Sequence, residues 1–202
     1  MEKRRNTFVL ATHNRDKLRE YREKLGTQVR LKTLDDFPGM PQAEEDGNSL
    51  RENAYKKARA VHAFTGLPAI ADDTGLEVAA LKGAPGLYSS RYAGENAGYR
   101  ENVLKLLEEM RGIPPEQRAA RFRTNIAFID DEDAWDVDGT VSGYILEEAR
   151  GEGGFGYDPV FYYAPLKKTF SELDIREKNH ISHRGKAIDA LIRRLREKQY
   201  IV

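Results

Sequence analysis

The chain of 202 residues is 40% hydrophobic, which is enough for one substantial domain, or two lobes sharing a cleft, around a buried core. Its 33 basic and 33 acidic side chains cancel, so the composition favours neither nucleic acid nor an anionic membrane as a partner. Because the sequence has no cysteine and no apolar run near the ~20 residues of a membrane span, it excludes a disulfide framework, a thiolate zinc site and a spanning helix.

The first predicted elements are a strand and a helix. "TFVLAT", residues 7–12, is typical of a short buried strand, and Leu18, Tyr21 and Leu25 then recur at helical spacing. The start of the chain is charged and only briefly apolar, too short for a secretion signal with its cleavage site. We therefore expect a cytoplasmic protein.

A capped helix and a second strand follow. Residues 48–66 contain Ser49 and Glu52 at the spacing of a capping box, and Gly66 stands near the stop, so a helix is predicted between them. "LPAIADD", residues 67–73, is then a short apolar strand that ends in two carboxylates.

The second half of the chain continues the alternation. The pattern predicts a helix over 99–112, a half-buried strand over 121–130, strand-like pieces around a turn over 135–146, a strand over 159–163 and a last helix. Because strands and helices interleave, we expect an α/β fold with a mixed sheet, in which ligands bind beyond the carboxyl ends of strands. The positions expected to be buried are Val103, Leu104, Leu107 and Met110 on the first helix, and Ile188, Leu191, Ile192 and Leu195 on the last.

The segment "ATHNRDK", residues 11–17, joins the first strand to the first helix. A helix N-terminus offers unpaired N–H groups and a positive dipole end, which suit phosphate, and Lys17, Thr12 and Asn14 add a charge and short hydrogen-bonding groups. The alternative is that Asn14 only caps the helix and Lys17 is solvated, since the glycines of a P-loop are missing.

The segment "ADDTGLE", residues 71–77, places Asp72 and Asp73 at the end of a predicted strand. Carboxylates there suit Mg²⁺, and one of them could take a proton from water. Asp-Thr-Gly also occurs in aspartic proteases, but their catalytic dyad needs two such segments and this chain has one. The remaining alternative is a structural turn.

Charged residues cluster in two further places. "AEEDG", residues 43–47, offers Glu44 and Glu45 before a helix that carries Lys57; both segments could equally be solvated surface. "REKNHISHRGKAI", residues 176–188, brings cations that could hold phosphate or a flat base, or form an ordinary basic helix start. The segment has two histidines but no apparent third ligand, so a zinc site is not favoured.

"GEGGFGYDPVF", residues 151–161, packs four glycines into six positions around Phe155 and Tyr157. An aromatic ring beside glycines can form a slot in which a flat base stacks, with backbone groups close enough to contact its edge. The alternative is a loop that only turns the chain into the next strand. Together with the phosphate and metal segments, this loop points to a nucleotide.

"LATHNRDK", "IADDTGLEVAALKGAPGLYSSRYAG", "GEGGFGYDPVF" and "ISHRGKAI" closely resemble, in this order, motifs of the inosine triphosphate pyrophosphatase family. The resemblance covers residues 8 to about 195. It implies an elongated α/β mixed-sheet fold, in one domain over 1–202 whose two lobes flank a deep substrate cleft. It also implies a homodimer that uses Mg²⁺.

The resemblance also implies roles for individual residues. Asp73 is the expected catalytic residue, and Asp73 with Glu44 the expected metal ligands. His13 stands where family members often have glycine, and Thr74 where they often have serine. The residues expected to bind substrate are Thr12, His13, Asn14, Arg15, Asp16, Lys17 and Lys57 at the phosphates, Thr74 beside the catalytic residue, and Phe155, Gly156, Tyr157, Asp158, Lys178, His183 and Arg184 at the base.

The activity implied is hydrolysis of ITP, dITP and XTP to the monophosphate and pyrophosphate, which clears these nucleotides from the pool. Two alternatives stay open from the sequence. One is the related Maf-type pyrophosphatase, which prefers other bases. The other is a nucleotide-binding protein without catalysis.

Overall fold

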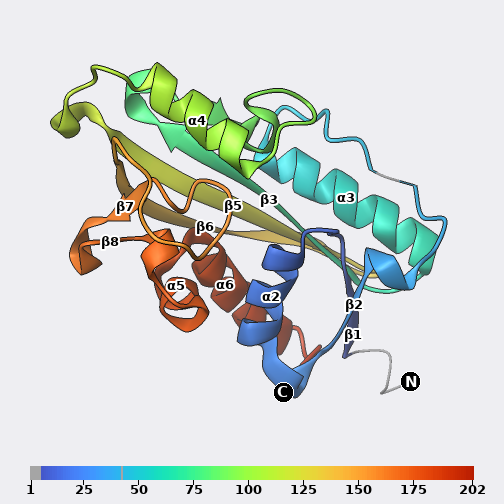
Figure 1. Cartoon of the computed structure of the whole chain (residues 1–202). Helices are drawn as coiled ribbons and strands as arrows, with labels where there is room; N and C mark the ends of the chain where they lie inside the picture. The colour runs from blue at the N-terminus through green and yellow to red at the C-terminus, as the bar shows by residue number, and fades with distance from the viewer. Residues whose placement is uncertain (1–5, 42) are drawn as a thin grey trace. The chain divides into compact units, whose positions relative to one another are not determined.

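The computed structural model describes residues 6–41 and 43–202; the charged start of the chain, on which the expectation about a secretion signal partly rests, lies outside them. One mixed sheet has the strand order β2-β1-β3-β5-β6-β7-β8, with β4 paired to β3 (Figure 1). β1 is parallel to β2 and β3, whereas β3–β4, β6–β7 and β7–β8 are antiparallel. The predicted α/β fold with a mixed sheet is confirmed.

The strands are β1 Thr7–Leu10, β2 Arg30–Thr33, β3 Ala69–Val78, β4 Pro85–Gly86, β5 Ala119–Ile129, β6 Ala134–Ile145, β7 Phe161–Tyr163 and β8 Lys168–Thr169. The α-helices are α2 Arg15–Leu25, α3 Leu50–Thr65, α4 Tyr99–Glu109, α5 Ile175–Ile181 and α6 His183–Glu197.

The chain divides into two compact units. Unit 1 holds the chain up to Asp73 together with Thr124–Gly139 and Arg184–Val202, and unit 2 holds Thr74–Arg123 and Thr140–His183. β3, β5 and β6 each continue from one unit into the other. The deep cleft that the resemblance implies stays a prediction.

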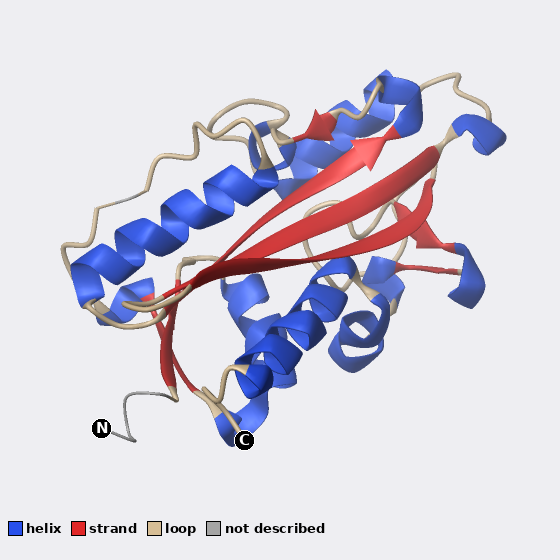
Figure 2. Ribbon diagram, turned by 180° about the vertical axis from the view of Figure 1, so that it is seen from behind, coloured by secondary structure: helices blue, strands red, loops and turns tan. Residues whose placement is uncertain are grey.

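Unit 1 has three layers. Helices α2 and α6 cover one face of its strands and α3 covers the opposite face (Figures 1 and 2). The strands explain this arrangement, because successive side chains of a strand point to opposite faces. Phe8, Leu10, Ile70, Ile126 and Phe128 pack with α2 and α6, and their alternate neighbours pack with α3.

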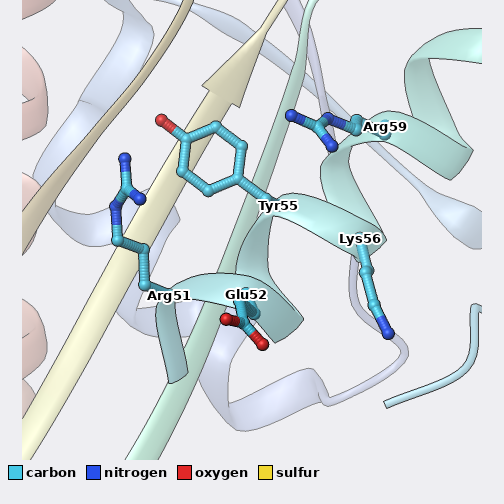
Figure 3. A pocket seen from close by; sticks show the side chains of 5 residues that line it. All are labelled: Arg51, Glu52, Tyr55, Lys56 and Arg59. Atoms are coloured by element: carbon cyan, nitrogen blue, oxygen red, sulfur yellow. The ribbon is translucent and has the colours of Figure 1, made fainter. Parts of the chain in front are cut away.

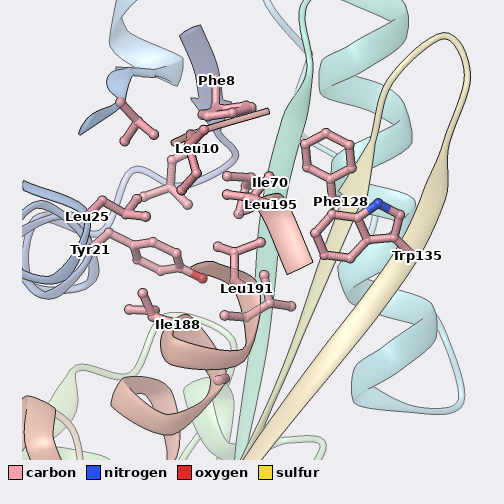
Figure 4. Packing of buried hydrophobic residues seen from close by; sticks show 14 residues of the cluster. Phe8, Leu10, Tyr21, Leu25, Ile70, Phe128, Trp135, Ile188, Leu191 and Leu195 are labelled. Atoms are coloured by element: carbon pink, nitrogen blue, oxygen red, sulfur yellow. The ribbon is translucent and has the colours of Figure 1, made fainter. Parts of the chain in front are cut away.

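The α2–α6 side of unit 1 is rich in large side chains (Figure 4). Tyr21 of α2 and Leu191 of α6 are fully buried there, and the Phe128 ring stacks on Trp135 with centroids 4.7 Å apart. The α3 side is richer in small residues, among them Ala54 and Ala58 of the helix and Ala71 of β3. Small residues on both partners let α3 lie close to the sheet.

Unit 2 packs α4 and the ends of the long strands around aromatic rings. Phe122 contacts Phe161 at a centroid distance of 4.6 Å and lies parallel to Phe170 at 6.1 Å. Arg118 is 3% exposed, and its guanidinium donates to the carbonyls of Ile145, Met110, Ile113 and Leu146. This side chain therefore joins the end of α4 to the end of β6.

Most predicted elements are present. α3 begins after its N-cap Ser49, whose hydroxyl accepts from the Glu52 amide, and ends at Gly66, where a φ of 63° suits glycine. No helix in the described part of the chain is long and apolar enough to cross a membrane.

Three local predictions were wrong. β3 does not end at the two carboxylates but runs on to Val78, and β6 is one continuous strand through the expected turn. On α4, Leu104 is 56% exposed while Leu106 is fully buried, because the helix turns a narrower face to the core than the apolar pattern suggested.

Candidate active site

Asp72 and Asp73 lie inside β3, where consecutive side chains face opposite sides of the sheet. Asp72 shares its face with Ile70 and so points to the α2–α6 side. Asp73 shares its face with Ala71 and points to the α3 side. The strand thus separates two adjacent like charges and supplies each with partners from a different helix layer.

On the α2–α6 side, Asp72 is 1% exposed and one of its oxygens, Oδ2, contacts two cations. Lys17 Nζ lies 3.0 Å away and Arg184 Nε lies 3.1 Å away. Arg184 also donates from Nη1 to Glu20 at 2.5 Å, so a chain of four charges, of which Asp72, Arg184 and Glu20 are buried, links α2, β3 and α6. Burial alone would raise the pKa of Asp72, but Lys17 and Arg184 outweigh burial and hold the pKa well below its usual range.

Lys17 is held where the sequence predicted, in the first turn of α2. Asn14 caps this helix, its Oδ1 accepting from the amides of Asp16 and Lys17, and Thr12 Oγ1 accepts from the Asn14 amide. Burial lowers the pKa of Lys17, and Asp72 offsets this only in part. The alternative in which Asn14 caps the helix is confirmed, whereas Lys17 is paired with Asp72 and is not solvated; the contact of this segment with phosphate stays a prediction.

On the α3 side, Asp73 is held by two donors. Lys57 Nζ lies 3.0 Å from Oδ1, and Asn53 Nδ2 donates to Oδ2 at 3.2 Å. Lys57 is 9% exposed and also contacts Glu45 at 3.4 Å. Burial alone would lower the pKa of Lys57, but the negative charges of Asp73 and Glu45 outweigh burial and raise the pKa of this lysine.

The acidic loop before α3 presents a different carboxylate from the one that the resemblance implied. Glu44 is exposed, whereas its neighbour Glu45 is half-buried and contacts Lys57. Both were candidates from the sequence, and the role of Glu44 at a metal stays a prediction. Within residues 6–41 and 43–202, no group of three or more His, Asp or Glu side chains is arranged to hold a metal ion by itself.

In unit 2 the glycine loop approaches the protein's own chain. Gly151 has a φ of +85°, and a Cβ there would lie 2.6 Å from the backbone of Ser171. Gly154 has a φ of +70°, and a Cβ there would lie 2.4 Å from a carboxylate oxygen of Asp158. These two glycines are therefore required by close packing inside unit 2, whatever the loop binds.

This packing presents Phe155 beside a cation. The Asp158 carboxylate accepts from the Phe155 amide at 2.8 Å and contacts Lys178 Nζ at 2.5 Å. Lys178 Nζ in turn lies 4.4 Å from the centre of the half-buried Phe155 ring, and Tyr99 contacts the same ring from α4. Tyr157 belongs to the core instead: it is 5% exposed and its hydroxyl donates to the Ser89 carbonyl.

The remaining predicted site residues are distributed over both units. His183, the last residue of unit 2, is 3% exposed and stacks on Phe122 with ring centroids 4.4 Å apart. His13 is exposed and contacts Asp35 at 3.2 Å, and Arg15 is exposed at the start of α2. Thr74 is half-buried and follows Asp73 in β3, and Gly156 has a φ of +61° in the glycine loop.

Sequence reasoning missed two residues that hold the charged groups in place. Asn53 lies one helical turn before Lys57 on α3, and Glu20 lies three residues after Lys17 on α2. The helical spacing of each to its lysine was a usable signal, because residues three or four apart share a helix face. The sequence does not reveal which residue of β3 or α6 Asn53 and Glu20 bind.

A hollow of about 340 Å³ lies along α3 and is lined by Arg51, Glu52, Tyr55, Lys56 and Arg59, none of which is a predicted site residue (Figure 3). Arg51 and Arg59 place their guanidinium carbons 4.9 and 5.5 Å from the centre of the Tyr55 ring. Arg51 Nε and the Tyr55 hydroxyl both donate to Asp136 on β6. These contacts attach α3 to the sheet.

Known proteins resemble this chain along most of its length. A model of the Ham1 family matches residues 8–194. A protein named dITP/XTP pyrophosphatase from Desulforamulus reducens is 51% identical over 185 residues, which are 90% of this chain and 91% of that protein. One with the same name from Geobacillus kaustophilus is 48% identical, over 91% of each chain.

Solved structures agree with these matches. A HAM1 protein from Coxiella burnetii superimposes with a TM-score of 0.85 at 43% identity, covering 95% of this chain and 98% of that one. A nucleoside-triphosphatase, dITP/XTP pyrophosphatase, from Mycobacterium abscessus has a TM-score of 0.74 at 38% identity, covering 92% and 98%.

Proposed function

The chain belongs to the Ham1 family, and we propose that it hydrolyses the non-standard purine nucleoside triphosphates ITP, dITP and XTP to the monophosphate and pyrophosphate. The observation that carries this function is about 50% identity, over nine-tenths of the chain, to proteins named dITP/XTP pyrophosphatase. The activity is that of a nucleoside triphosphate pyrophosphohydrolase, and it removes these nucleotides from the pool.

The charges of unit 1 support a division of roles in this reaction. Lys17, at the start of α2, and Lys57, on α3, are the cations that face phosphate. The oxygen of a water molecule bonds to the α-phosphorus while the bond from that phosphorus to the α–β bridging oxygen breaks, so the bridging oxygen leaves with pyrophosphate. Asp73 accepts the proton of the water, and the two lysines offset the negative charge that develops on the leaving group.

The donor set around Lys57 fits Mg²⁺. Asp73 and Glu45 both turn oxygens toward one ammonium group, at 3.0 and 3.4 Å, so this point already attracts a cation between two hard oxygen ligands. We propose that Asp73 and Glu45 would hold the metal together with oxygens of the substrate; Glu44, the ligand that the resemblance implied, is exposed, and its role stays a prediction. When bound, Mg²⁺ supplies charge neutralisation and makes water more acidic.

Unit 2 offers the groups that suit a purine base. Phe155 provides a half-buried ring for stacking, and Lys178, anchored by Asp158, provides a donor beside it. A donor aimed at the 6-keto oxygen accepts hypoxanthine and xanthine but opposes the 6-amino group of adenine. Guanine shares the 6-keto oxygen, so its rejection must depend on the 2-position. The homodimer and the cytoplasmic location stay predictions.

A substrate panel tests the function. ITP, dITP, XTP, dTTP, UTP, ATP and GTP are each incubated with the protein, with and without Mg²⁺, and the products are separated by ion-exchange chromatography. We expect monophosphate and pyrophosphate from ITP, dITP and XTP when Mg²⁺ is present. Preferential hydrolysis of UTP or dTTP would instead support a Maf-type enzyme, and release of orthophosphate alone would rule out the proposed bond cleavage.

A further inference from the structure

Asn53 makes two directed hydrogen bonds from one buried amide. The residue lies on α3, is 1% exposed, and donates from Nδ2 to Asp73 Oδ2 at 3.2 Å. Its Oδ1 accepts from the backbone amide of Gly47 at 2.8 Å. One side chain therefore connects the expected catalytic carboxylate to the acidic loop that carries Glu45.

The two partners fix the orientation of this amide. An ionised carboxylate can only accept a hydrogen bond and a peptide N–H can only donate one. Turning the amide over would place Nδ2 against the Gly47 N–H and Oδ1 against the Asp73 carboxylate, which would break both bonds. The arrangement at Asn53 is thus set by its surroundings and leaves the Nδ2 donor aimed at Asp73.

The loop is packed tightly onto the same amide. A Cβ on Gly47 would lie 2.6 Å from Asn53 Oδ1 and 2.9 Å from Glu52 Cβ, so a side chain at this position forces the loop away from α3. The next residue is also held, because the Asn48 amide donates to the Glu52 carboxylate at 2.7 Å. The loop backbone two residues after Glu45 is therefore anchored to α3.

We propose that Asn53 is a positioning residue that sets the Asp73 carboxylate and the Glu45 loop relative to each other. Lys57 holds Oδ1 of Asp73 and Asn53 holds Oδ2, so the plane of the carboxylate is defined by two donors from one face of α3. The Gly47 bond extends this order to the loop. The inference rests on the proposed function, because it assigns Asp73 the proton-accepting role.

The variant Asn53→Asp tests the hydrogen bond to Asp73 separately from the hydrogen bond to the Gly47 amide. An aspartate keeps an oxygen for the Gly47 amide but replaces the donor to Asp73 by a second carboxylate oxygen. We expect kcat for dITP to fall about 10–100-fold, as for other residues that orient a reactive group, with KM changed much less. The Gly47 amide should keep its protection from hydrogen exchange in this variant. In Asn53→Ala both bonds are lost, so exchange at Gly47 should also accelerate, about tenfold.

Asn102 on α4 provides a matched control. It is 2% exposed, its Oδ1 accepts from the Ala93 amide at 2.8 Å, and its Nδ2 donates to the Ser90 carbonyl at 3.0 Å. Asn102→Asp therefore removes the same kind of buried bond without touching a carboxylate. We expect it to lower the melting temperature, though less than Asn53→Asp, which also sets a second carboxylate against Asp73, and to leave kcat unchanged.

Each result decides the proposal. Normal kcat in folded Asn53→Asp, or an equal loss of kcat in Asn102→Asp, overturns it. If Asn53→Asp does not fold, Gly47→Ala tests the link from the loop side, and normal kcat in that variant overturns it as well. Wild-type protein run in parallel distinguishes failure of the proposed function from failure of this proposal. If the wild type does not hydrolyse dITP, the proposed function is wrong, whereas hydrogen exchange at Gly47 still tests whether Asn53 holds the loop.

Discussion

Asp72 and Asp73 are adjacent in the chain, yet their carboxylates bind cations on opposite faces of β3, Lys17 and Arg184 on one face and Lys57 on the other. Asp72 is the more deeply buried of the two, and Lys17 and Arg184 outweigh its burial and hold its pKa low. The geometry favours a structural role for Asp72, which neutralises Lys17 and Arg184, and leaves Asp73 for chemistry.

Replacing Asp73 by Asn tests the chemical role. The amide keeps the size of the side chain but cannot accept a proton from water, so turnover of dITP should fall by several orders of magnitude in a protein that still folds. Pyrophosphate release is the measurement, and circular dichroism checks the fold. Near-normal pyrophosphate release from this variant would remove Asp73 from the mechanism.

Replacing Asp72 by Asn tests the structural role. Lys17 and Arg184 then lose the carboxylate they share, and breaking a buried ion pair from one side costs about 3–5 kcal/mol in the free energy of unfolding. Urea unfolding measures the cost. The control is Asp46→Asn, which breaks the exposed pair with Lys56 and should change stability little. Equal effects of the two variants would contradict the assignment.

Replacing Phe155 by Ala tests the base slot. Loss of a stacking ring costs about 1–3 kcal/mol per base, which corresponds to a KM for dITP about 5–150-fold higher. Tyr157→Phe is the matched control, since that ring is buried and loses only its bond to the Ser89 carbonyl. An unchanged KM in Phe155→Ala would exclude this ring from base binding.

Much of unit 1 could be predicted because its signals are local. Ser49, Glu52 and Gly66 fixed the ends of α3, and the Asn14 cap placed Lys17 at the start of α2. The continuation of β3 through Asp72 could not be predicted, because an unpaired carboxylate inside a buried strand is unfavourable. The compensating Arg184 lies 112 positions away, and the Glu20 that completes the network lies 164 positions from Arg184.

The glycine loop shows the same limit in unit 2. The sequence indicated a close approach at residues 151–156 but not what is approached, which for Gly151 is the backbone of Ser171. Likewise the two aromatic residues of the loop look equivalent in sequence. Only the fold separates Tyr157, whose ring completes the core, from Phe155, whose ring lies beside Lys178.

Arg118 provides a stability test that is independent of the site. Its guanidinium donates to four carbonyls at the ends of α4 and β6, and a lysine cannot reproduce this planar set of donors. Arg118→Lys should lower the free energy of unfolding by about 1–3 kcal/mol, because it removes guanidinium donors from these carbonyls. Urea unfolding gives the value, and Arg121→Lys, on an exposed pair with Glu77, serves as control. Equal stability of Arg118→Lys and wild type would show that water replaces the lost donors.

Asp136 of β6, which binds Arg51 and Tyr55 of α3, predicts that the free energy of unfolding depends on pH. Burial would raise its pKa, but Asn125, Arg51 and Tyr55 donate to the carboxylate and together lower the pKa below its usual value. A carboxyl whose pKa is lower in the folded state contributes its full stabilisation above the unfolded pKa of about 3.9, and this is lost as the pH falls through the folded value. The free energy of unfolding of wild type should therefore exceed that of Asp136→Asn by a constant margin between about pH 5 and 7, and the margin should shrink below about pH 4. Urea unfolding at stepped pH values measures it. A margin that stays constant down to pH 2 would mean that the three donors do not hold Asp136 in its ionised form.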